Sequence, residues 1–233
     1  MTRLSTLKAT MATAGVAVAF AIAGCTANST SIAPIPQAPA RPASAKIMDT
    51  TPSPTPTPIQ LVIGGVVGTP NWPEGDTATG GQGQQVQGLN CMKALSPPFH
   101  HHAHLSLFVD GQQFAFPLGV GMFQPGKGKS GYIYHQTCLY FLHTHDQTGI
   151  LHMESKTGQP FTLGTAFKLW GEPLSTTQVA QYTGAVSVYV NGTLDTTDPI
   201  AGVPLNPGDD ITLVVGQAPS WIPAYILPAS LSP

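Results

Sequence analysis

The sequence predicts a mainly β (α+β) domain in which antiparallel hairpins form a sandwich or a partly open barrel, with a short helical insertion. Apolar and polar residues alternate over 105–109, 112–116, 186–190 and 211–215, which is typical of half-buried strands. Asp110-Gly111 and Asn191-Gly192 separate such runs, and both dipeptides favour two-residue hairpin turns. Charged residues make up only 9% of the chain, so Thr, Ser, Gln and Gly must supply the polar surface, as in secreted β proteins.

The first hairpin has a definite register. If Val109 lies opposite Gln112, Leu107 meets Phe114 and one apolar face results. The second hairpin joins 186–190 to 193–194, and a last strand, 211–215, follows a turn at 206–209.

Two short helices are predicted between these hairpins. Thr162 can cap a helix that presents Leu163, Phe167 and Trp170 on one face and ends at Gly171. Ser175-Thr176-Thr177-Gln178 is a capping-box pattern that predicts a second helix, ending at Gly184.

The N-terminal residues 1–24 are predicted to be a signal peptide. Arg3 and Lys8 precede an apolar run over 11–24 that is too short to span a bilayer as a helix. The run ends in Ile22-Ala23-Gly24-Cys25, which resembles a bacterial lipoprotein cleavage box. The resemblance implies lipidation of Cys25, attachment to a bacterial membrane and a domain outside the cytoplasm, in the cell envelope. The alternative is an ordinary signal peptide that contains a cysteine.

Residues 25–58 are predicted to tether the lipidated Cys25 to a folded domain at 59–233. Eight prolines fall between Pro34 and Pro58, and such a segment favours extended polyproline II, so it cannot build a core. A disordered spacer is the alternative. The folded part carries a small negative net charge and no basic run, which argues against a nucleic-acid partner.

Cys91 and Cys138 are the two cysteines left in the folded part. In an oxidising compartment two cysteines usually pair, and this disulfide would join the segments that precede the two histidine blocks. The alternative is that one or both cysteines bind copper or zinc.

All eight histidines fall between His100 and His152. Because side chains alternate along a strand, extending the first hairpin strand backwards puts His100, His102 and His104 on one face. His101 falls on the core face with Ala103 and Leu105.

The second histidine block predicts a hairpin around 146–149. A four-residue loop puts His143 opposite His152, so that His143, His145, His152 and Glu154 share a face. A three-residue loop, 147–149, would turn His152 to the other side; we favour the first register. Asp146 is better explained as a turn residue than as a ligand. The predicted metal ligands are His100, His102, His104, His143, His145 and His152, with Glu154 and Asp146 as auxiliary candidates.

The two blocks together resemble a family of bacterial extracytoplasmic and lipoprotein domains that carry H-x-H-A-H-L followed by L-H-T-H-D-x-x-G-x-x-H-x-E-S. The resemblance rests on 99–105 and on 142–155, and it extends over most of 88–216. It implies a single domain and no particular activity. His100 and His102 match the family's H-x-H, whereas His101 stands where an apolar residue is usual.

The histidines predict a protein that binds zinc or copper, for metal acquisition, buffering or delivery. Imidazole suits both ions. A metal-dependent enzyme with Glu154 as base is one alternative, with Tyr132, Tyr134, Tyr140 and Trp170 as candidates to line a pocket. However, the sequence contains neither His-Glu-x-x-His nor Gly-x-Ser-x-Gly, and no catalytic residue is predicted. A structural or interaction module with a metal-free histidine network is the other alternative.

Overall fold

The computed structural model describes residues 57–93, 96–197 and 199–231, all of which belong to one compact unit, Ser53–Pro233. The predicted signal peptide, Cys25 and nearly all of the predicted tether lie outside the described residues. Among the residues that are described, no helix is both long and apolar enough to cross a membrane.

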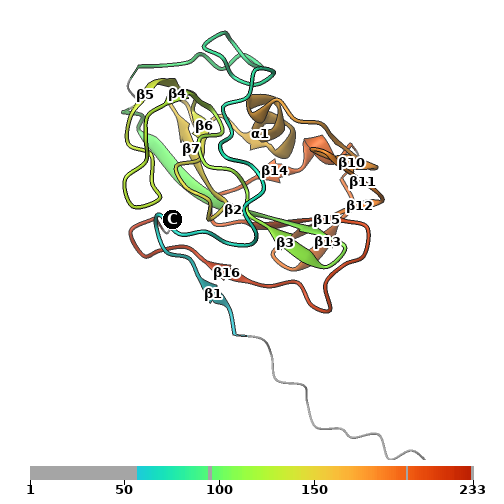
Figure 1. The fold of residues 1–233 in the computed structure, drawn as a ribbon. Helices are drawn as coiled ribbons and strands as arrows, with labels where there is room; N and C mark the ends of the chain where they lie inside the picture. The colour runs from blue at the N-terminus through green and yellow to red at the C-terminus, as the bar shows by residue number, and fades with distance from the viewer. Residues whose placement is uncertain (1–56, 94–95, 198, 232–233) are drawn as a thin grey trace, which may run out of the picture. The chain divides into compact units, whose positions relative to one another are not determined.

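The largest sheet has seven strands. Six of them follow the order β13-β12-β15-β2-β7-β6, and β3 also pairs with β2. Their bounds are β2 Phe99–Val109, β3 Gln112–Phe114, β6 Leu142–His143, β7 Ile150–Ser155, β12 Val186–Val190, β13 Thr193–Asp195 and β15 Asp210–Val215. The predicted mainly β class is confirmed, and Figure 1 shows β2 running through the middle of this arrangement.

Strand β2 is long because it serves two sets of neighbours in turn. Its first half pairs with β7 in antiparallel register, from Phe99 opposite Ser155 to His104 opposite Ile150. Its second half pairs in parallel with β15 and in antiparallel register with β3. The histidine block and the apolar run 105–109 are therefore one continuous strand.

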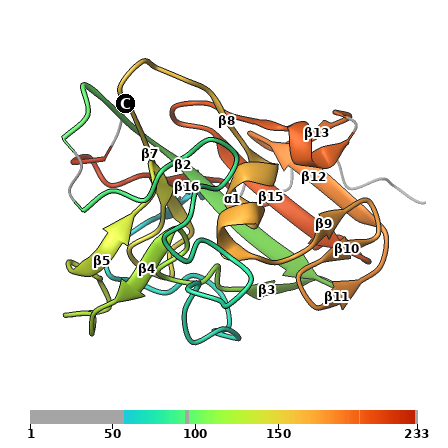
Figure 2. The ribbon, with the colours of Figure 1, turned by 90° about the horizontal axis from the view of Figure 1, so that it is seen from above.

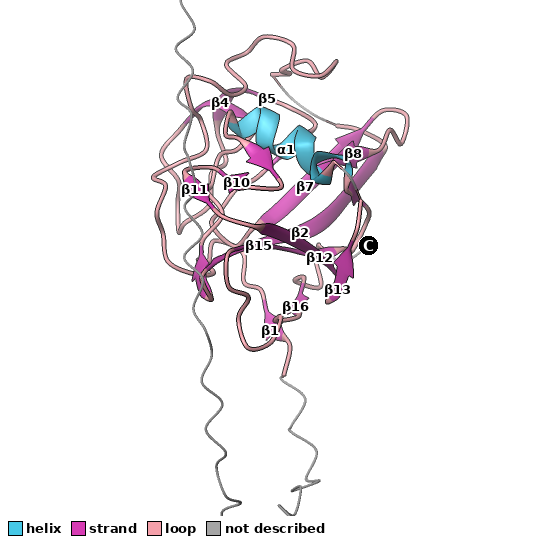
Figure 3. Ribbon diagram, turned by 90° about the vertical axis from the view of Figure 1, so that its right-hand side faces the viewer, coloured by secondary structure: helices cyan, strands magenta, loops and turns pink. Residues whose placement is uncertain are grey.

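The core lies on one face of this sheet. Ala103, Leu105 and Leu107 of β2 are at most 1% exposed, and they belong to one hydrophobic cluster with the helix α1, Leu163–Trp170. Figures 2 and 3 show α1 lying against this side of β2 and β15. Thr162 caps the helix by accepting a hydrogen bond from the Thr165 N–H, and the left-handed Gly171 ends it, as predicted.

We call the opposite face the polar face because it carries the buried His102, His104 and Ser106 of β2. It also carries Ile150, which packs in a small apolar cluster with Leu61 and Tyr225. It is covered by the two-stranded pair β1 (Ile59–Gln60) and β16 (Tyr225–Ile226), which Figure 3 shows on the side away from α1. Ser106 and Thr212 are paired neighbours on this face and share a hydrogen bond of 3.0 Å between their hydroxyls. Both side chains are buried, so this face is enclosed as well.

Short strands complete the described part of the fold. Their bounds are β4 Met122–Pro125, β5 Gln136–Leu139, β8 Phe161–Thr162, β9 Leu174–Ser175, β10 Gln178–Val179, β11 Tyr182–Thr183 and β14 Pro204–Leu205, with a 3-10 turn η1 at Ile200–Gly202.

Both hairpin registers predicted from the turn dipeptides are confirmed. Val109 lies opposite Gln112 with Leu107 opposite Phe114, and Val190 lies opposite Thr193.

The predicted second helix is wrong, because 174–183 forms the small sheet β9-β10-β11. The Ser175 hydroxyl accepts a hydrogen bond from the Thr177 N–H in a local turn, and Gln178 then pairs directly with Ser175 across that turn. Thr176, Thr177 and Val179 are β-branched, which favours this extended arrangement over a helix.

The predicted disulfide is present. Cys91 and Cys138 are bonded, with a Cα–Cα distance of 5.4 Å. Next to this bond, Met92 and Leu139 exchange two backbone hydrogen bonds. The long segment that precedes β2 is thereby attached to β5, and both sulfurs are committed to each other rather than to a metal.

Candidate metal centre

Three histidines stand in a row across three adjacent strands of the main sheet. His102 of β2 lies opposite His152 of β7, and His152 lies opposite His143 of β6. Directly paired residues project from the same face of a sheet, so the row lies on the polar face. The predicted register, with His143 opposite His152, is confirmed. The connection is longer than the predicted loop at 146–149, because β6 ends at His143 and β7 begins at Ile150.

Together with His100 and His145, the three histidines of this row form two groups of three that share one member. We call His100, His102 and His152 the β2 group, and His143, His145 and His152 the β6 group. In each group the three candidate ligand nitrogens all lie within 4.8 Å of one another. His152 belongs to both groups, and the described part of the chain therefore contains two sets of side chains that could hold a metal ion.

The β6 group is held with its coordinating nitrogens turned inward. His143 Nδ1 lies 2.8 Å from the Tyr140 carbonyl oxygen and His145 Nδ1 lies 2.6 Å from that of Ile133. A carbonyl only accepts, so each Nδ1 carries the proton and donates it. In the neutral rings each Nε2 then carries an unprotonated lone pair, and the two Nε2 atoms face each other at 3.1 Å. Two lone pairs at this distance repel unless a cation or a shared proton lies between them.

Thr144 fixes the backbone between these two ligands. Its hydroxyl donates to the Pro117 carbonyl at 2.9 Å and accepts from the Val120 N–H at 3.0 Å. Its own N–H donates to the Val120 carbonyl, and its carbonyl accepts from the Gly119 N–H. Such contacts behind metal-binding histidines orient the rings before any ion arrives.

The β2 group is looser and more open. His100 is exposed, and its Nε2 lies 3.3 Å from His152 Nδ1. His102 is buried, and its Nε2 has no hydrogen-bond partner among the described residues. The centroids of the His100 and His102 rings lie 4.6 Å apart. A buried nitrogen without a partner is costly, and a metal ion would relieve that cost.

Glu154 adds a carboxylate at the edge of the β2 group. It pairs with His100 across β2 and β7, and its Oε1 lies 3.6 Å from His100 Nε2. Its Oε2 is buried and has no hydrogen-bond partner within the described ranges. Burial raises the pKa of Glu154 to about 7, because desolvation disfavours the charged carboxylate.

Burial also keeps the five imidazoles neutral. Desolvation is the main cause that lowers the pKa of His102 to about 4, and it lowers those of His143 and His152 well below the usual value. The pKa values of His100 and His145 are lowered by the same cause. A neutral imidazole has a free lone pair, so at neutral pH the cluster is in the protonation state that a metal requires.

The structure removes His104 from the predicted ligand set. Its Nδ1 lies 2.9 Å from Asp210 Oδ1 and its Nε2 lies 2.9 Å from the Thr148 carbonyl oxygen. Both ring nitrogens are engaged with oxygen atoms of Asp210 and Thr148, so neither is left free for an ion. The ring also packs on Tyr225, with centroids 4.2 Å apart. Its role is to connect β2, β15, β16 and the loop before β7.

Asp146 is not an auxiliary ligand either. Its Oδ1 accepts from both the N–H and the hydroxyl of Thr148, and its Oδ2 accepts from the Gly64 N–H at 2.7 Å. The residue therefore acts as the predicted turn former. The same loop requires glycine at 149, where φ is +83° and a Cβ would lie 2.1 Å from the Leu105 carbonyl oxygen.

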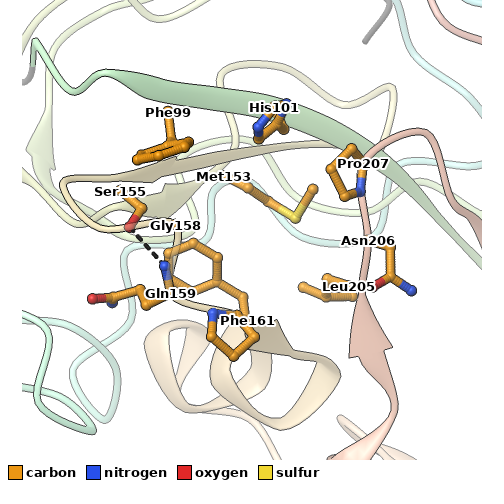
Figure 4. Close-up of a pocket in the computed structure, with 11 residues that line it drawn as sticks. Phe99, His101, Met153, Ser155, Gly158, Gln159, Phe161, Leu205, Asn206 and Pro207 are labelled. Atoms are coloured by element: carbon orange, nitrogen blue, oxygen red, sulfur yellow. Dashed lines mark hydrogen bonds between the residues drawn. The ribbon is translucent and has the colours of Figure 1, made fainter.

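His101 and His135 lie outside the cluster, as strand alternation predicts for His101. His135 is exposed. His101 faces the other side of the sheet, and Figure 4 shows it beside Met153 at a cavity of about 330 Å³. This cavity and the histidine cluster are separated by β2 and β7. Tyr140 and Trp170, considered as pocket-lining residues, are fully buried in the core.

Two further residues contribute to the site: the sequence points to Tyr132 only as a pocket-lining candidate, and it gives no signal at Leu231. Tyr132 stacks on His145, with ring centroids 4.4 Å apart and an interplanar angle of 4°. The backbone of Leu231 forms a hydrogen bond that favours the protonated form of His102, so the C-terminal segment reaches the β2 group. Ile133, whose carbonyl oxygen accepts from His145 Nδ1, stands in the sequence only as an apolar residue between two tyrosines.

Comparison with family models, with curated proteins and with solved structures finds no match to this chain. The functional argument therefore rests on the geometry of the cluster.

Proposed function

We propose that this chain is a lipid-anchored extracytoplasmic protein that binds zinc or copper through its clustered histidines, for metal acquisition, buffering or delivery. The observation that carries the proposal is the pair of Nε2 atoms of His143 and His145. They face each other at 3.1 Å while both Nδ1 atoms donate to carbonyls. Histidine ligands with their second nitrogen held by a carbonyl are the common arrangement at zinc and copper sites.

The choice between zinc and copper follows the ligand chemistry. All five candidate ligands are imidazoles, which suit both ions. Met153 would favour copper(I), but it lies on the core side at the cavity of Figure 4. We therefore expect zinc(II) and copper(II) to bind, with copper(II) the tighter of the two because imidazole sites follow the Irving–Williams order.

The test is metal binding by the full-length chain, purified in detergent and stripped with a chelator. Titration calorimetry and elemental analysis with copper(II) and zinc(II) should show uptake by the wild-type protein and by His135→Gln, whose exposed histidine lies outside the cluster. A variant with His100, His102, His143, His145 and His152 all changed to glutamine should take up neither ion. Equal uptake by this variant, or none by the wild type, would refute metal binding by the cluster.

A metal-dependent enzyme is the second candidate, and Glu154 is the observation that favours it. A buried carboxylate with a pKa of about 7 beside candidate ligands is suited to general base chemistry. The cavity of Figure 4 opens on the far side of the sheet from it. If the protein is an enzyme, hydrolysis of a panel of ester, amide and phosphate substrates should require metal and fall in Glu154→Gln. Metal binding without turnover supports the binding role.

A further inference from the structure

We propose that the histidine cluster holds two metal ions and that His152 is a ligand to both, giving one ring nitrogen to each. The inference rests on the proposed function, and it adds the number of ions and the residue that joins them. It follows from the position of His152 in the sheet, from the contact between its Nδ1 and His100, and from polar atoms in both groups that a cation would satisfy.

The position of His152 is central. Strand β7 lies between β2 and β6 in the main sheet (Figure 1). His102 pairs with His152 on one side and His143 pairs with it on the other. Its ring centroid lies 4.6 Å from those of both His102 and His145, which belong to different groups.

We assign the two ring nitrogens of His152 to different groups. Nδ1 lies 3.3 Å from His100 Nε2 and therefore faces the β2 group. His152 is also a member of the β6 group, so with Nδ1 assigned to the β2 group, Nε2 is the nitrogen left for the β6 ion. An imidazole has two coordinating nitrogens that point away from each other, and this is the geometry that a shared ligand requires.

Each group contains polar atoms that a cation bound in that group would stabilise. In the β6 group the Nε2 atoms of His143 and His145 repel at 3.1 Å. In the β2 group His102 Nε2 and Glu154 Oε2 are both buried without a hydrogen-bond partner among the described residues. The candidate nitrogens fall into two sets of three, so an ion in one set leaves the needs of the other unmet. Glu154 would supply negative charge beside the β2 ion.

The proton balance is simple. Neutral His152 carries one ring proton, and coordination of the first ion uses the unprotonated nitrogen. Coordination of the second ion breaks the remaining N–H bond, and the proton leaves to solvent, which yields an imidazolate bound at both nitrogens. No electron is transferred, and both ions stay divalent.

The test uses copper(II) with the full-length chain in detergent, quantified by elemental analysis and by electron paramagnetic resonance. The wild-type protein should bind about two copper ions per chain. Its resonance signal should be much weaker than two isolated spins, because an imidazolate couples the two copper(II) ions antiferromagnetically. One copper per chain, or two with the full intensity of isolated spins, would overturn the shared ligand.

Paired variants make the test independent of any one substitution. His100→Gln with His102→Gln should remove the β2 ion, and His143→Gln with His145→Gln should remove the β6 ion. Each double variant should bind about one copper with full signal intensity, and His135→Gln should match the wild type. His152→Gln should abolish the coupling; coupling that persists in it would contradict the proposal.

The outcomes also separate this inference from the proposed function. No copper or zinc in the wild-type protein would refute metal binding itself, and with it the shared ligand. A single bound ion that is lost in only one of the two double variants would leave metal binding intact and overturn the two-ion site.

Discussion

The two faces of strands β2 and β7 are built from alternate residues of the same segments, yet they differ in what holds them. On one face Ala103 and Leu151 are fully buried and pack with α1. On the other, His102 and His152 are nearly as buried, at 6% and 4% exposed, but burial lowers the pKa of both imidazoles, and His102 Nε2 has no hydrogen-bond partner among the described residues. A buried apolar side chain is stabilised by removal from water alone, whereas a buried ring nitrogen needs a hydrogen-bond partner or a metal ion.

Stability and function are therefore divided between the two faces. We expect the stability contributed by packing on the core face to be independent of pH and of metal. The histidine face is costly to enclose, because desolvation lowers the pKa of its imidazoles and His102 Nε2 has no hydrogen-bond partner within the part of the chain that the structure describes. We expect its contribution to stability to depend on pH and on metal, and the following predictions test that difference.

The largest effect should come from the core face. Leu151→Ala removes a fully buried side chain and should lower the free energy of unfolding by about 2–5 kcal/mol. The loss should be the same with and without metal, measured by chemical denaturation. Leu194→Ala, at a side chain that is 54% exposed, is the control and should change stability by less than about 0.5 kcal/mol. A loss that disappears when metal is removed would contradict the division of roles.

Metal removal should affect the histidine face alone. An ion that binds only the folded state adds about 2.7 kcal/mol when its free concentration is a hundred times the Kd. Chelation should therefore lower the melting temperature of the wild type and of His135→Gln. The His143→Gln/His145→Gln variant should respond less. An equal response in that variant would show that the ion binds elsewhere.

Acid should weaken the metal-free protein. Histidines whose pKa is lowered in the fold take up protons on unfolding once the pH falls below about 6.5, the usual value. Each such histidine should reduce stability by up to about 1.4 kcal/mol per pH unit below that value, and for His102 the effect should end near pH 4. Glu154, whose pKa is raised to about 7, acts in the opposite direction between about pH 4.5 and 7.

The measurement is chemical denaturation of the chelated protein at steps from pH 8 to pH 4. The wild type should be most stable above about pH 6.5, and His102→Gln should show a shallower decline below it. A stability that is flat or rises from pH 6.5 to pH 4 would contradict neutral buried imidazoles.

Local patterns were sufficient to predict the strands and the faces. The period-two alternation placed His100 and His102 apart from His101, and the turn dipeptides fixed two hairpin registers. The predicted hairpin aligned His143 with His152 correctly, although its connection runs over 144–149 and not over 146–149 alone. These features depend on residues close together in the chain, where geometry has few solutions.

Features that depend on distant partners could not be predicted. His104 appeared equivalent to His102 by alternation, but Asp210, 106 residues later, accepts from its ring. Likewise, the pattern at 175–178 satisfies a capping box and a tight turn equally well, and pairing with the neighbouring short strand decides between them. In each case a contact brought in by tertiary structure outweighs the local signal.

The smallest effect concerns Tyr132, which the sequence suggests only as a pocket-lining residue. Tyr132 stacks on His145 at an interplanar angle of 4°, and such aromatic contacts are worth about 0.5–1.5 kcal/mol. Tyr132→Leu should loosen the His145 ring and weaken copper(II) binding about 2- to 10-fold, measured by chelator competition. Tyr189→Leu, in β12, is the matched control and should leave the affinity unchanged, since β12 is separated from β7 by β15 and β2. Equal affinities in the two variants would mean that the carbonyl of Ile133, which accepts from His145 Nδ1 at 2.6 Å, is sufficient to hold the ring.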